Sequence, residues 1–306
     1  MEFNHISVLL GETIDSLNIM PDGIYVDGTA GGAGHSREIA KRLKTGKLFA
    51  FDKDPDAVKI ATERLSQYNA EVINSDFSEM TEQLETRGIT EVDGIILDLG
   101  VSSYQLDTAE RGFSYHKEAP LDMRMSKSGI SAYDIVNNFS ANELSEIFFR
   151  FGEEKFGRKI ADKIVEYRQN KKIETTTELA ELIANTVPAA ARRDGHPARK
   201  CFQAIRIAVN AELEVLKIAL DKCFNLLKKD GVLSIITFHS LEDRMVKQAF
   251  KEYCTGCTCP PDFPVCVCGK VPKGRLLTRK PIEPSDEELQ QNPRSRSAKL
   301  RVIIKN

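Results

Sequence analysis

Four acidic residues follow successive strand-like segments in the first hundred residues of the chain. Asp27, Asp52, Asp76 and Asp98 stand at or shortly after the ends of the expected strands 24–27, 48–51, 71–74 and 94–97. In open parallel sheets ligands bind beyond the carboxyl ends of the strands, so these acids are expected to line one site. The alternative is a set of acids that only cap helices.

A glycine-rich turn joins the first expected strand to the first expected helix. Residues 27–34 read Asp-Gly-Thr-Ala-Gly-Gly-Ala-Gly and are followed by His35. Glycines in this context permit a tight turn and close approach of the backbone to a ligand. Asp52 is placed to accept hydrogen bonds from ribose hydroxyls, which suits NAD and S-adenosylmethionine equally. The turn departs from the G-x-G-x-x-G pattern of pyrophosphate binding, which favours S-adenosylmethionine, and Phe77 would pack on its adenine.

The elements that position these residues alternate as strands and helices with a period near 25 residues, which is typical of a parallel sheet. After Asp98 the alternation stops, and a loop at 101–124 leads into a helical region. A stretch from Phe202 to Leu227 keeps apolar residues at helical spacing and is expected to be one return helix that stops before Gly231. Three later segments complete a sheet of seven strands: 232–238, 276–281 and 299–305.

The expected fold class is therefore α/β, with the Rossmann-like seven-stranded sheet of a class I S-adenosylmethionine-dependent methyltransferase and an inserted α-helical domain. We place the methyltransferase domain at residues 1–108 and 211–306, and the helical insertion at 109–210. The length of 306 residues, 41% hydrophobic residues and net charge of -2 suit a globular protein and do not by themselves indicate a nucleic-acid binder. The first ten residues contain no targeting or membrane-spanning pattern, so a cytoplasmic protein is expected.

The motifs in this order resemble the bacterial MraW/RsmH methyltransferases over nearly the whole chain. The resemblance rests on blocks that include His5, 27–29, 34–36, 52–55, 97–103, 105–107, 110–114, 120–125, 196–198, 202–206, 238–244 and 292–294. It implies methylation of the exocyclic N4 of a cytosine in small-subunit ribosomal RNA. It also implies S-adenosylmethionine contacts from Ala33, Gly34, His35, Asp52, Phe77, Asp98 and Gln105. Ala33 stands where other members have glycine, so its contact is expected through the backbone.

Methyl transfer to cytosine N4 needs a hydrogen-bond acceptor, because the lone pair of this amine is delocalised into the ring. An acceptor that draws on the amine hydrogens stabilises the transition state. Many amino-methyltransferases place Asp/Asn-Pro-Pro-aromatic after the fourth strand, whereas this chain has Asp98-Leu99-Gly100-Val101. Asp98 could thus serve the amino acid end of the cofactor, the target amine, or both. Ser102 and His239 are the other catalytic candidates, with a structural role as the alternative for His239.

RNA binding is expected of the helical insertion, which the family resemblance describes as RNA-facing, and of the basic C-terminal segment. A base must leave its stack to reach such a site while Arg and Lys hold the phosphates. The RNA-binding candidates are Arg199, Gln203, Arg206, Asn210, Arg294 and Arg296. Solvated surface is the alternative interpretation. The partner is small-subunit RNA or the assembled small subunit, and a homodimer is left open.

Five of the seven cysteines lie close together near residue 260. Cys254, Cys257, Cys259, Cys266 and Cys268 offer enough thiolates for a tetrahedral structural zinc site, although their spacing is not a standard pair of C-x-x-C motifs. Reduced loop thiols are the alternative. Cys201 and Cys223 fall on or beside the apolar stripe of the return helix and are interpreted as core.

Two other classes of protein compete with a methyltransferase. An NAD-dependent Rossmann enzyme would need the pyrophosphate-binding glycine pattern and a hydride-transfer site, which the sequence does not present. A non-catalytic RNA-binding protein would use the helical insertion and the basic segment without affinity for a nucleotide cofactor.

Overall fold

The computed structural model describes residues 7–192, 195–260, 265 and 267–306. It divides into two compact units. Unit 1 comprises Met1–Gly100 with Leu213–Asn306, and unit 2 comprises Val101–Glu212. The structure thus starts the insertion at Val101, eight residues before the position expected from the sequence. His5 and Cys266 lie outside the described residues.

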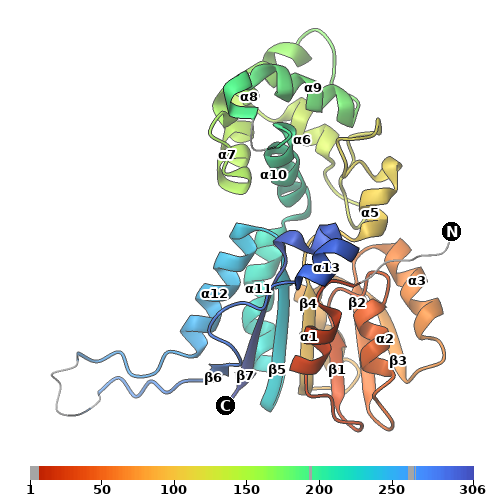
Figure 1. The fold of residues 1–306 in the computed structure, drawn as a ribbon, viewed down its shortest axis with the longest axis vertical. Helices are drawn as coiled ribbons and strands as arrows, with labels where there is room; N and C mark the ends of the chain where they lie inside the picture. Colours follow the sequence, from red (N-terminus) through yellow and green to blue (C-terminus); the bar gives the residue numbers. More distant parts are fainter. Residues whose placement is uncertain (1–6, 193–194, 261–264, 266) are drawn as a thin grey trace. The chain divides into compact units, whose positions relative to one another are not determined.

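Unit 1 is built on one seven-stranded sheet of order β3-β2-β1-β4-β5-β7-β6 (Figure 1). The strands are β1 (Ile24–Asp27), β2 (Lys47–Asp52), β3 (Ala70–Asn74), β4 (Val92–Asp98), β5 (Leu227–Thr237), β6 (Gly274–Leu276) and β7 (Lys299–Lys305). The first five run parallel, and β7 is antiparallel to both of its neighbours, β5 and β6. The expected sheet of seven strands is confirmed.

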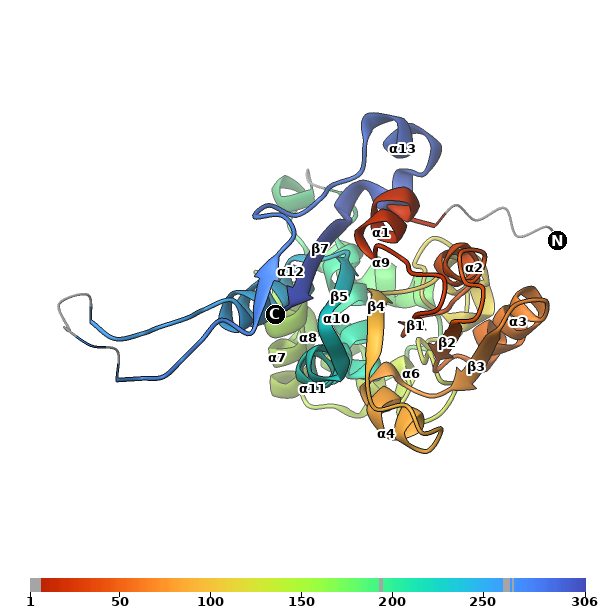
Figure 2. The ribbon, with the colours of Figure 1, turned by 90° about the horizontal axis from the view of Figure 1, so that it is seen from below.

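Side chains alternate between the two faces of this sheet, and helices cover both (Figure 2). In β2, Leu48 and Ala50 pack on one face, while Phe49 and Phe51 pack on the other. Burial of each large apolar side chain contributes about 1.5–3 kcal/mol. The first face is covered by α1 (Leu10–Ser16), α2 (Gly34–Ala40) and α3 (Pro55–Leu65), and the second by α4 (Met80–Glu85), α11 (Glu212–Leu226) and α12 (Ser240–Tyr253).

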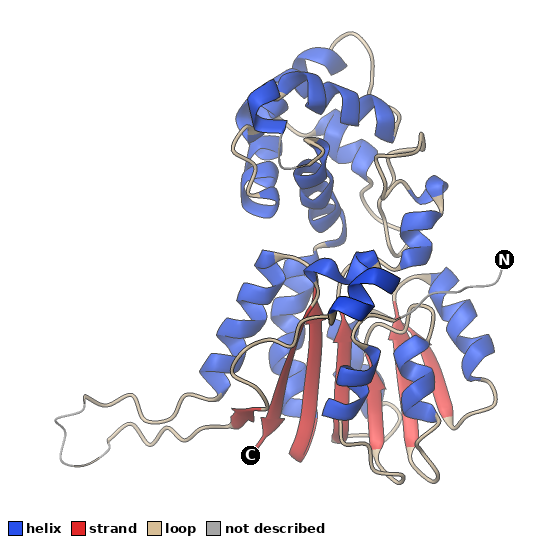
Figure 3. Cartoon of the chain, in the orientation of Figure 1, coloured by secondary structure: helices blue, strands red, loops and turns tan. Residues whose placement is uncertain are grey.

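Unit 2 is helical, and Figure 3 shows no strand drawn within it. Its helices are α5 (Ser103–Asp107), α6 (Ala132–Asn138), α7 (Ala141–Gly152), α8 (Gly157–Arg168), α9 (Thr176–Thr186) and α10 (Ala198–Asn210). Ser140 and Glu143 form a capping box at the start of α7. The hydrophobic core of unit 2 includes Leu144, Phe148 and Ile205, which are fully buried. The structure thus gives the insertion an independent hydrophobic core.

The return helix expected from 202 to 227 is two helices. Ala211 adopts a left-handed conformation with φ of 49°, and its N–H bonds to the Ile207 carbonyl, which ends α10. The helix α11 then starts at Glu212. The boundary between the two units falls directly after this residue. The prediction of one continuous helix was wrong because apolar spacing continues across the break, and alanine gives no signal for a left-handed residue.

Two strand boundaries also differ from the expectation. The chain enters β5 at Leu227, five residues before the expected start. The other difference is at β6, which ends at Leu276 instead of continuing to Pro281. Beyond it, the Leu277 N–H still donates to the Val302 carbonyl, and Ile282 pairs with Leu300 as an isolated bridge. Pro281 has no N–H to donate, so pairing along β7 is intermittent there.

A smaller terminal segment completes unit 1. The helix α13 (Asp286–Gln291) precedes a 3-10 turn at Pro293–Ser297 that leads into β7. From α13, the Glu288 carboxylate accepts a hydrogen bond from the Leu9 N–H at 2.9 Å. This contact ties the terminal segment to the start of α1, on the face of the sheet that carries the glycine-rich turn.

Candidate active site

The glycine-rich turn links the end of β1 to the start of α2, as the sequence indicated. The Gly28 N–H donates to the Ile96 carbonyl and the Ala30 N–H to the Phe51 carbonyl, which fastens the turn to two strands. Gly31 has a φ of 49° and Ala33 a φ of 59°, so both lie in the left-handed region. Alanine pays a steric cost there, which explains why glycine is the natural residue at such a position.

Two acidic side chains, Asp27 and Asp52, hold the turn in shape through hydrogen bonds. Asp27 is buried, and its carboxylate accepts hydrogen bonds from the Thr29 N–H at 3.0 Å and the Ser36 hydroxyl at 2.6 Å. Asp52 accepts from the Gly31 N–H at 2.8 Å and the Asp54 N–H at 2.8 Å. Burial raises the pKa of each of the Asp27 and Asp52 carboxyls to about 6.

Asp98 is the last residue of β4, and its carboxyl group lacks the support that the other acids have. Its backbone N–H donates to the Thr29 hydroxyl at 2.6 Å, which joins β4 to the turn. Its Oδ1 atom is buried and has no hydrogen-bond partner among the described residues. Burial, followed by the charges of Asp27 and Glu242, raises the pKa of Asp98 to about 8. A buried acceptor without a partner is costly in a folded protein and is a sign of a ligand site.

His35 stands beside the other oxygen of this carboxyl group. Its Nε2 lies 3.1 Å from the Val8 carbonyl, and its Nδ1 lies 3.7 Å from Asp98 Oδ2. Because a carbonyl can only accept, Nε2 carries the hydrogen, and in the neutral ring Nδ1 is then an acceptor.

Asp76 and Phe77 follow β3 at the same edge of the sheet. The Asp76 carboxylate accepts from the Ser78 N–H at 2.9 Å and lies 3.4 Å from the Lys53 ammonium. It therefore caps the short 3-10 helix Phe77–Glu79, as the alternative for an acid of this kind predicted. The Phe77 ring packs beside the core of unit 1 and is half-buried.

His239 follows β5 and is the N-cap of α12. Its Nδ1 accepts the Glu242 N–H at 3.3 Å, and its Nε2 lies 3.1 Å from Glu242 Oε1. Glu242 in turn accepts hydrogen bonds from the N–H groups of Phe238 and His239. The Nδ1 atom of His239 thus caps α12, whereas its Nε2 is buried without a hydrogen-bond partner among the described residues, and a catalytic role of His239 stays a prediction. The sequence reasoning missed Glu242, although the spacing His-x-x-Glu before an apolar helix is the pattern of a capping box.

Two candidates from the fourth-strand motif belong to unit 2. Ser102 is the N-cap of α5, where its hydroxyl accepts the Gln105 N–H at 3.2 Å. The Gln105 side chain is buried and accepts the Ser102 N–H at 3.0 Å, which completes a capping box. The catalytic role of Ser102 and the cofactor contact of Gln105 stay predictions.

The RNA-binding candidates on α10 are held by their own unit. Arg206 forms a two-bond ion pair with Glu212, at 2.8 Å for each bond. The Asn210 amide accepts from the Met125 N–H and donates to the carbonyls of Met123 and Arg206. Gln203 Nε2 donates to the Phe151 carbonyl at 3.1 Å. These residues organise the insertion, and their contact with RNA stays a prediction.

Other basic candidates lie on the surface. Arg199 is exposed near the start of α10, and Arg294 and Arg296 are exposed on the 3-10 turn before β7. Exposed guanidinium groups are accessible to phosphates from solvent, and the RNA contacts of these three residues stay predictions.

Three of the five clustered cysteines come together in the structure. The sulfur atoms of Cys257, Cys259 and Cys268 all lie within 4.8 Å of one another. Cys254 ends α12 instead and packs beside the core of unit 1. Cys201 and Cys223 are fully buried, so their interpretation as core residues is confirmed.

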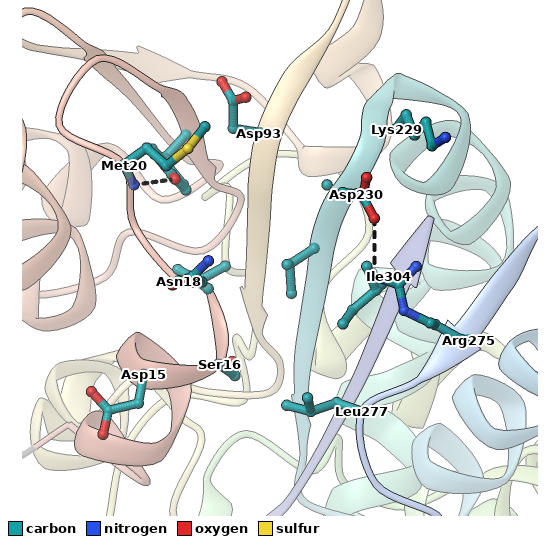
Figure 4. A pocket seen from close by; sticks show the side chains of 14 residues that line it. Asp15, Ser16, Asn18, Met20, Asp93, Lys229, Asp230, Arg275, Leu277 and Ile304 are labelled. Carbon is teal, nitrogen blue, oxygen red and sulfur yellow. Dashed lines mark hydrogen bonds and ion pairs between the residues drawn. The ribbon is translucent and has the colours of Figure 1, made fainter. Parts of the chain in front are cut away.

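A pocket of about 350 Å³ lies at the opposite end of the sheet (Figure 4). It is lined by residues from the amino ends of β1, β4 and β5, among them Asp93 and Asp230. Asp230 pairs with Arg275 at 2.9 Å, and Asp93 pairs with Lys228 at 2.8 Å. Asp93 and Asp98 are five residues apart on one strand, roughly 16 Å. The pocket is therefore separate from the acids at the carboxyl ends.

The topology of unit 1, with five parallel strands and an antiparallel β7 between β5 and β6, defines a class I methyltransferase fold. Comparison with known proteins agrees. A family model described as the MraW methylase family matches residues 2–306, and the chain belongs to this family.

Relatives of high similarity carry a more specific name. A protein of Clostridium botulinum (strain Loch Maree / Type A3) is 59% identical over 308 residues, with 100% of each chain covered. A second, from Clostridium botulinum (strain 657 / Type Ba4), has the same identity and coverage. Both are named ribosomal RNA small subunit methyltransferase H.

Solved structures that resemble the chain do so at low identity. An rRNA methylase from Streptococcus thermophilus is 14% identical with a TM-score of 0.43, and 98% of each chain is covered. A ribosomal protein L11 methylase from Lactobacillus delbrueckii subsp. bulgaricus is 8% identical with a TM-score of 0.42, covering 97% of this chain and 77% of the other. In the part of the chain that the structure describes, no helix has the length and apolar character to cross a membrane.

Proposed function

We propose that this protein transfers the methyl group of S-adenosylmethionine to the exocyclic N4 of a cytosine in small-subunit ribosomal RNA. The family assignment and the name of its 59% identical relatives support methylation of this RNA. The observation that carries the choice of chemistry is the buried, unpartnered Oδ1 of Asp98. An amine hydrogen is the donor that this atom lacks.

The residues of the turn suit S-adenosylmethionine. This cofactor supplies a methyl group on a sulfonium cation and also carries an ammonium group. Burial raises the pKa values of Asp27, Asp52 and Asp98. A cation bound beside these carboxyls favours their ionised form and is attracted to it. A side chain at Gly31 would meet only the Thr29 carbonyl, at 3.8 Å, so the turn leaves open space for a ligand there.

The acids divide their work by position. Asp52 would accept hydrogen bonds from the ribose hydroxyls, since each of its oxygens keeps a lone pair beyond its bond to a backbone N–H. Asp27 would remain a support of the turn, because Thr29 and Ser36 occupy it. Ala33 and Gly34 would approach the cofactor through their backbone, as residues at the start of α2.

Asp98 would act on the target amine. The carboxylate accepts a hydrogen bond from N4 and draws electron density onto the nitrogen, which strengthens the nucleophile. When the N4–methyl bond forms and the sulfur–methyl bond breaks, the amine loses one proton. Asp98 takes this proton and passes it to solvent, while S-adenosylhomocysteine leaves as the second product. A pKa of about 8 suits a group that alternates between both states near neutral pH.

Cationic side chains are the proposed contacts for RNA phosphates. Arg199, Arg294 and Arg296 are exposed, so their guanidinium groups are open to phosphates from solvent. Such contacts position a strand without reading its sequence. Small-subunit RNA, alone or within the assembled subunit, is the proposed partner.

The test is a product analysis with purified components. The protein is incubated with methyl-labelled S-adenosylmethionine and with either naked small-subunit RNA or assembled small subunits from cells that lack the enzyme. Digestion to nucleosides and mass spectrometry then identify the labelled product. We expect N4-methylcytidine at one position in at least one arm. Label on another base or on another cytosine atom, or no label with either substrate, contradicts the proposal.

A further inference from the structure

The loop that joins α12 to β6 has no core of its own. The described stretches 254–260 and 267–273 of this loop form two limbs that run side by side in both views (Figures 1 and 2). Within its described part there is no helix or strand, and the side chains of Val265, Val267 and Val271 are 70–73% exposed. Loops longer than about 12–15 residues without secondary structure are uncommon in compact domains and are often functional.

Sulfur atoms are what the two limbs bring together. Cys257 and Cys259 lie on the outgoing limb and Cys268 on the returning limb, and their three Sγ atoms lie within 4.8 Å of one another. The Sγ atoms of Cys257 and Cys268 are 3.7 Å apart. At that separation they are not joined by a disulfide, whose sulfur atoms lie about 2.05 Å apart.

Backbone amides point at the same sulfur atoms. The Thr258 N–H donates to Cys268 Sγ at 3.5 Å, and the Cys259 N–H donates to Cys257 Sγ at 3.4 Å. The Val267 N–H donates to Cys259 Sγ at 3.4 Å. Two of these hydrogen bonds run from one limb to the other, so the backbone of both limbs surrounds the sulfur atoms.

We propose that Cys257, Cys259 and Cys268 bind a zinc ion that ties the two limbs of this loop together. Tetrahedral zinc has zinc–sulfur bonds of about 2.3 Å, which sets neighbouring sulfur atoms about 3.8 Å apart. The Cys257–Cys268 distance of 3.7 Å fits one edge of that tetrahedron. Three soft sulfur ligands select zinc over magnesium or calcium.

Cys254 is the natural control for this site. It is also a loop-end cysteine, yet it packs beside the core of unit 1 and is not part of the sulfur group. The proposed ion would stabilise the loop because it closes a segment that apolar contacts leave untied. Its role is structural, so it is independent of the proposed methyl transfer.

The test measures metal directly on the full-length protein. Protein purified under reducing conditions with zinc present is dialysed, and zinc per chain is measured by mass spectrometry for the unmodified protein and four variants: Cys254→Ser, Cys257→Ser, Cys259→Ser and Cys268→Ser. We expect about one zinc in the unmodified protein and in Cys254→Ser. Each of the other three variants is expected to bind zinc at least tenfold more weakly and therefore to hold less zinc after dialysis.

A second readout separates coordination from loose binding. Cobalt substituted for zinc gives intense visible absorption only in a tetrahedral sulfur site, and this absorption is expected to be lost in Cys268→Ser while circular dichroism stays unchanged. The proposal is overturned by a reduced protein that holds no zinc, by retention of zinc in Cys257→Ser, or by a Cys257–Cys268 disulfide in protein kept reduced.

Discussion

The strand-end acids of unit 1 and the polar face of α10 in unit 2 differ in how fully their polar side chains are hydrogen-bonded in the folded protein. Asp98 ends a strand with a buried oxygen that no described residue satisfies and with a pKa raised to about 8. Asn210, in contrast, ends α10 with its amide bonded to three backbone groups of its own unit. Residue type and position suggested function for both. The difference teaches that the Asp98 carboxyl is open to a further hydrogen bond, whereas the Asn210 amide is occupied by its own unit.

The largest effect is expected at Asp98. Replacement Asp98→Asn removes the acceptor of the amine proton but keeps the shape, so kcat for methyl transfer should fall about 10³-fold. The matched control is Asp93→Asn at the other end of the same strand, where the carboxylate pairs with Lys228.

Steady-state kinetics with labelled cofactor would check this pair of variants. Affinity for S-adenosylhomocysteine, measured by calorimetry, should change little in Asp98→Asn. If the variant instead loses this affinity while keeping kcat, Asp98 holds the amino acid end of the cofactor and not the target amine.

The second prediction concerns Asn210. Replacement Asn210→Ala leaves the buried Met125 N–H and the Met123 carbonyl without their partner, so the free energy of unfolding should fall by about 1–3 kcal/mol. Asn170→Ala serves as control, because Asn170 is an exposed asparagine of the same unit. Urea denaturation of the full chain measures both. A stable Asn210→Ala variant with weakened RNA binding would assign this residue to the RNA and break the contrast.

The third prediction is a pH dependence of cofactor affinity. Ionised carboxylates favour a cation, and the pKa values of Asp27, Asp52 and Asp98 are raised to about 6, 6 and 8. Affinity for S-adenosylmethionine should therefore rise about tenfold or more between pH 6 and pH 8.5. Calorimetry in buffers of different ionisation enthalpy should detect proton release, and Asp98→Asn should flatten the rise above pH 7.

The same acids determine whether the free energy of unfolding of the ligand-free protein rises or falls with pH. A carboxyl whose pKa is raised on folding binds more protons in the folded state than in the unfolded state across the interval between the two pKa values. The free energy of unfolding of the ligand-free protein should thus decrease as pH rises from about 4 to 8. The decrease should be smaller in Asp98→Asn. Equal slopes for both proteins would contradict the assignment of the raised pKa to Asp98.

The smallest effect is expected at Ala33, where two terms oppose each other. Glycine relieves the left-handed strain of about 1–2 kcal/mol, whereas loss of the buried methyl and a freer unfolded chain cost a similar amount. Ala33→Gly should therefore stay within about 0.5 kcal/mol of the unmodified protein. Ala61→Gly, buried within α3, has no such relief and should lose about 1.5–2 kcal/mol. Thermal denaturation of the two variants compares them.

Much of unit 1 could be predicted from the sequence because its signals are local. The apolar runs that end in Asp27, Asp52 and Asp98 specify buried parallel strands, and the glycines after Asp27 specify the turn. The break at Ala211 could not be found, since alanine rarely adopts the left-handed conformation that ends α10 and therefore gives no local signal for it.

The state of each site residue was harder to predict than its position. Sequence spacing placed Asp98 and Asn210, but only the surrounding contacts show that one is unsatisfied and the other saturated. The cysteines show the same limit. Five close in sequence suggested one cluster, while the structure separates Cys254, because its place at the end of α12 puts it beside the core.

The order of strands in the sheet has a consequence for synthesis of the chain. The partner of β4 is β5, and 128 residues separate Asp98 from Leu227. At about 5–20 residues per second, a ribosome needs roughly 6–26 s to make them. During that time β4 is a strand with one unpaired edge, which is the kind of surface that recruits other nascent chains. The contiguous insertion can fold during this interval, so its completion precedes closure of the sheet.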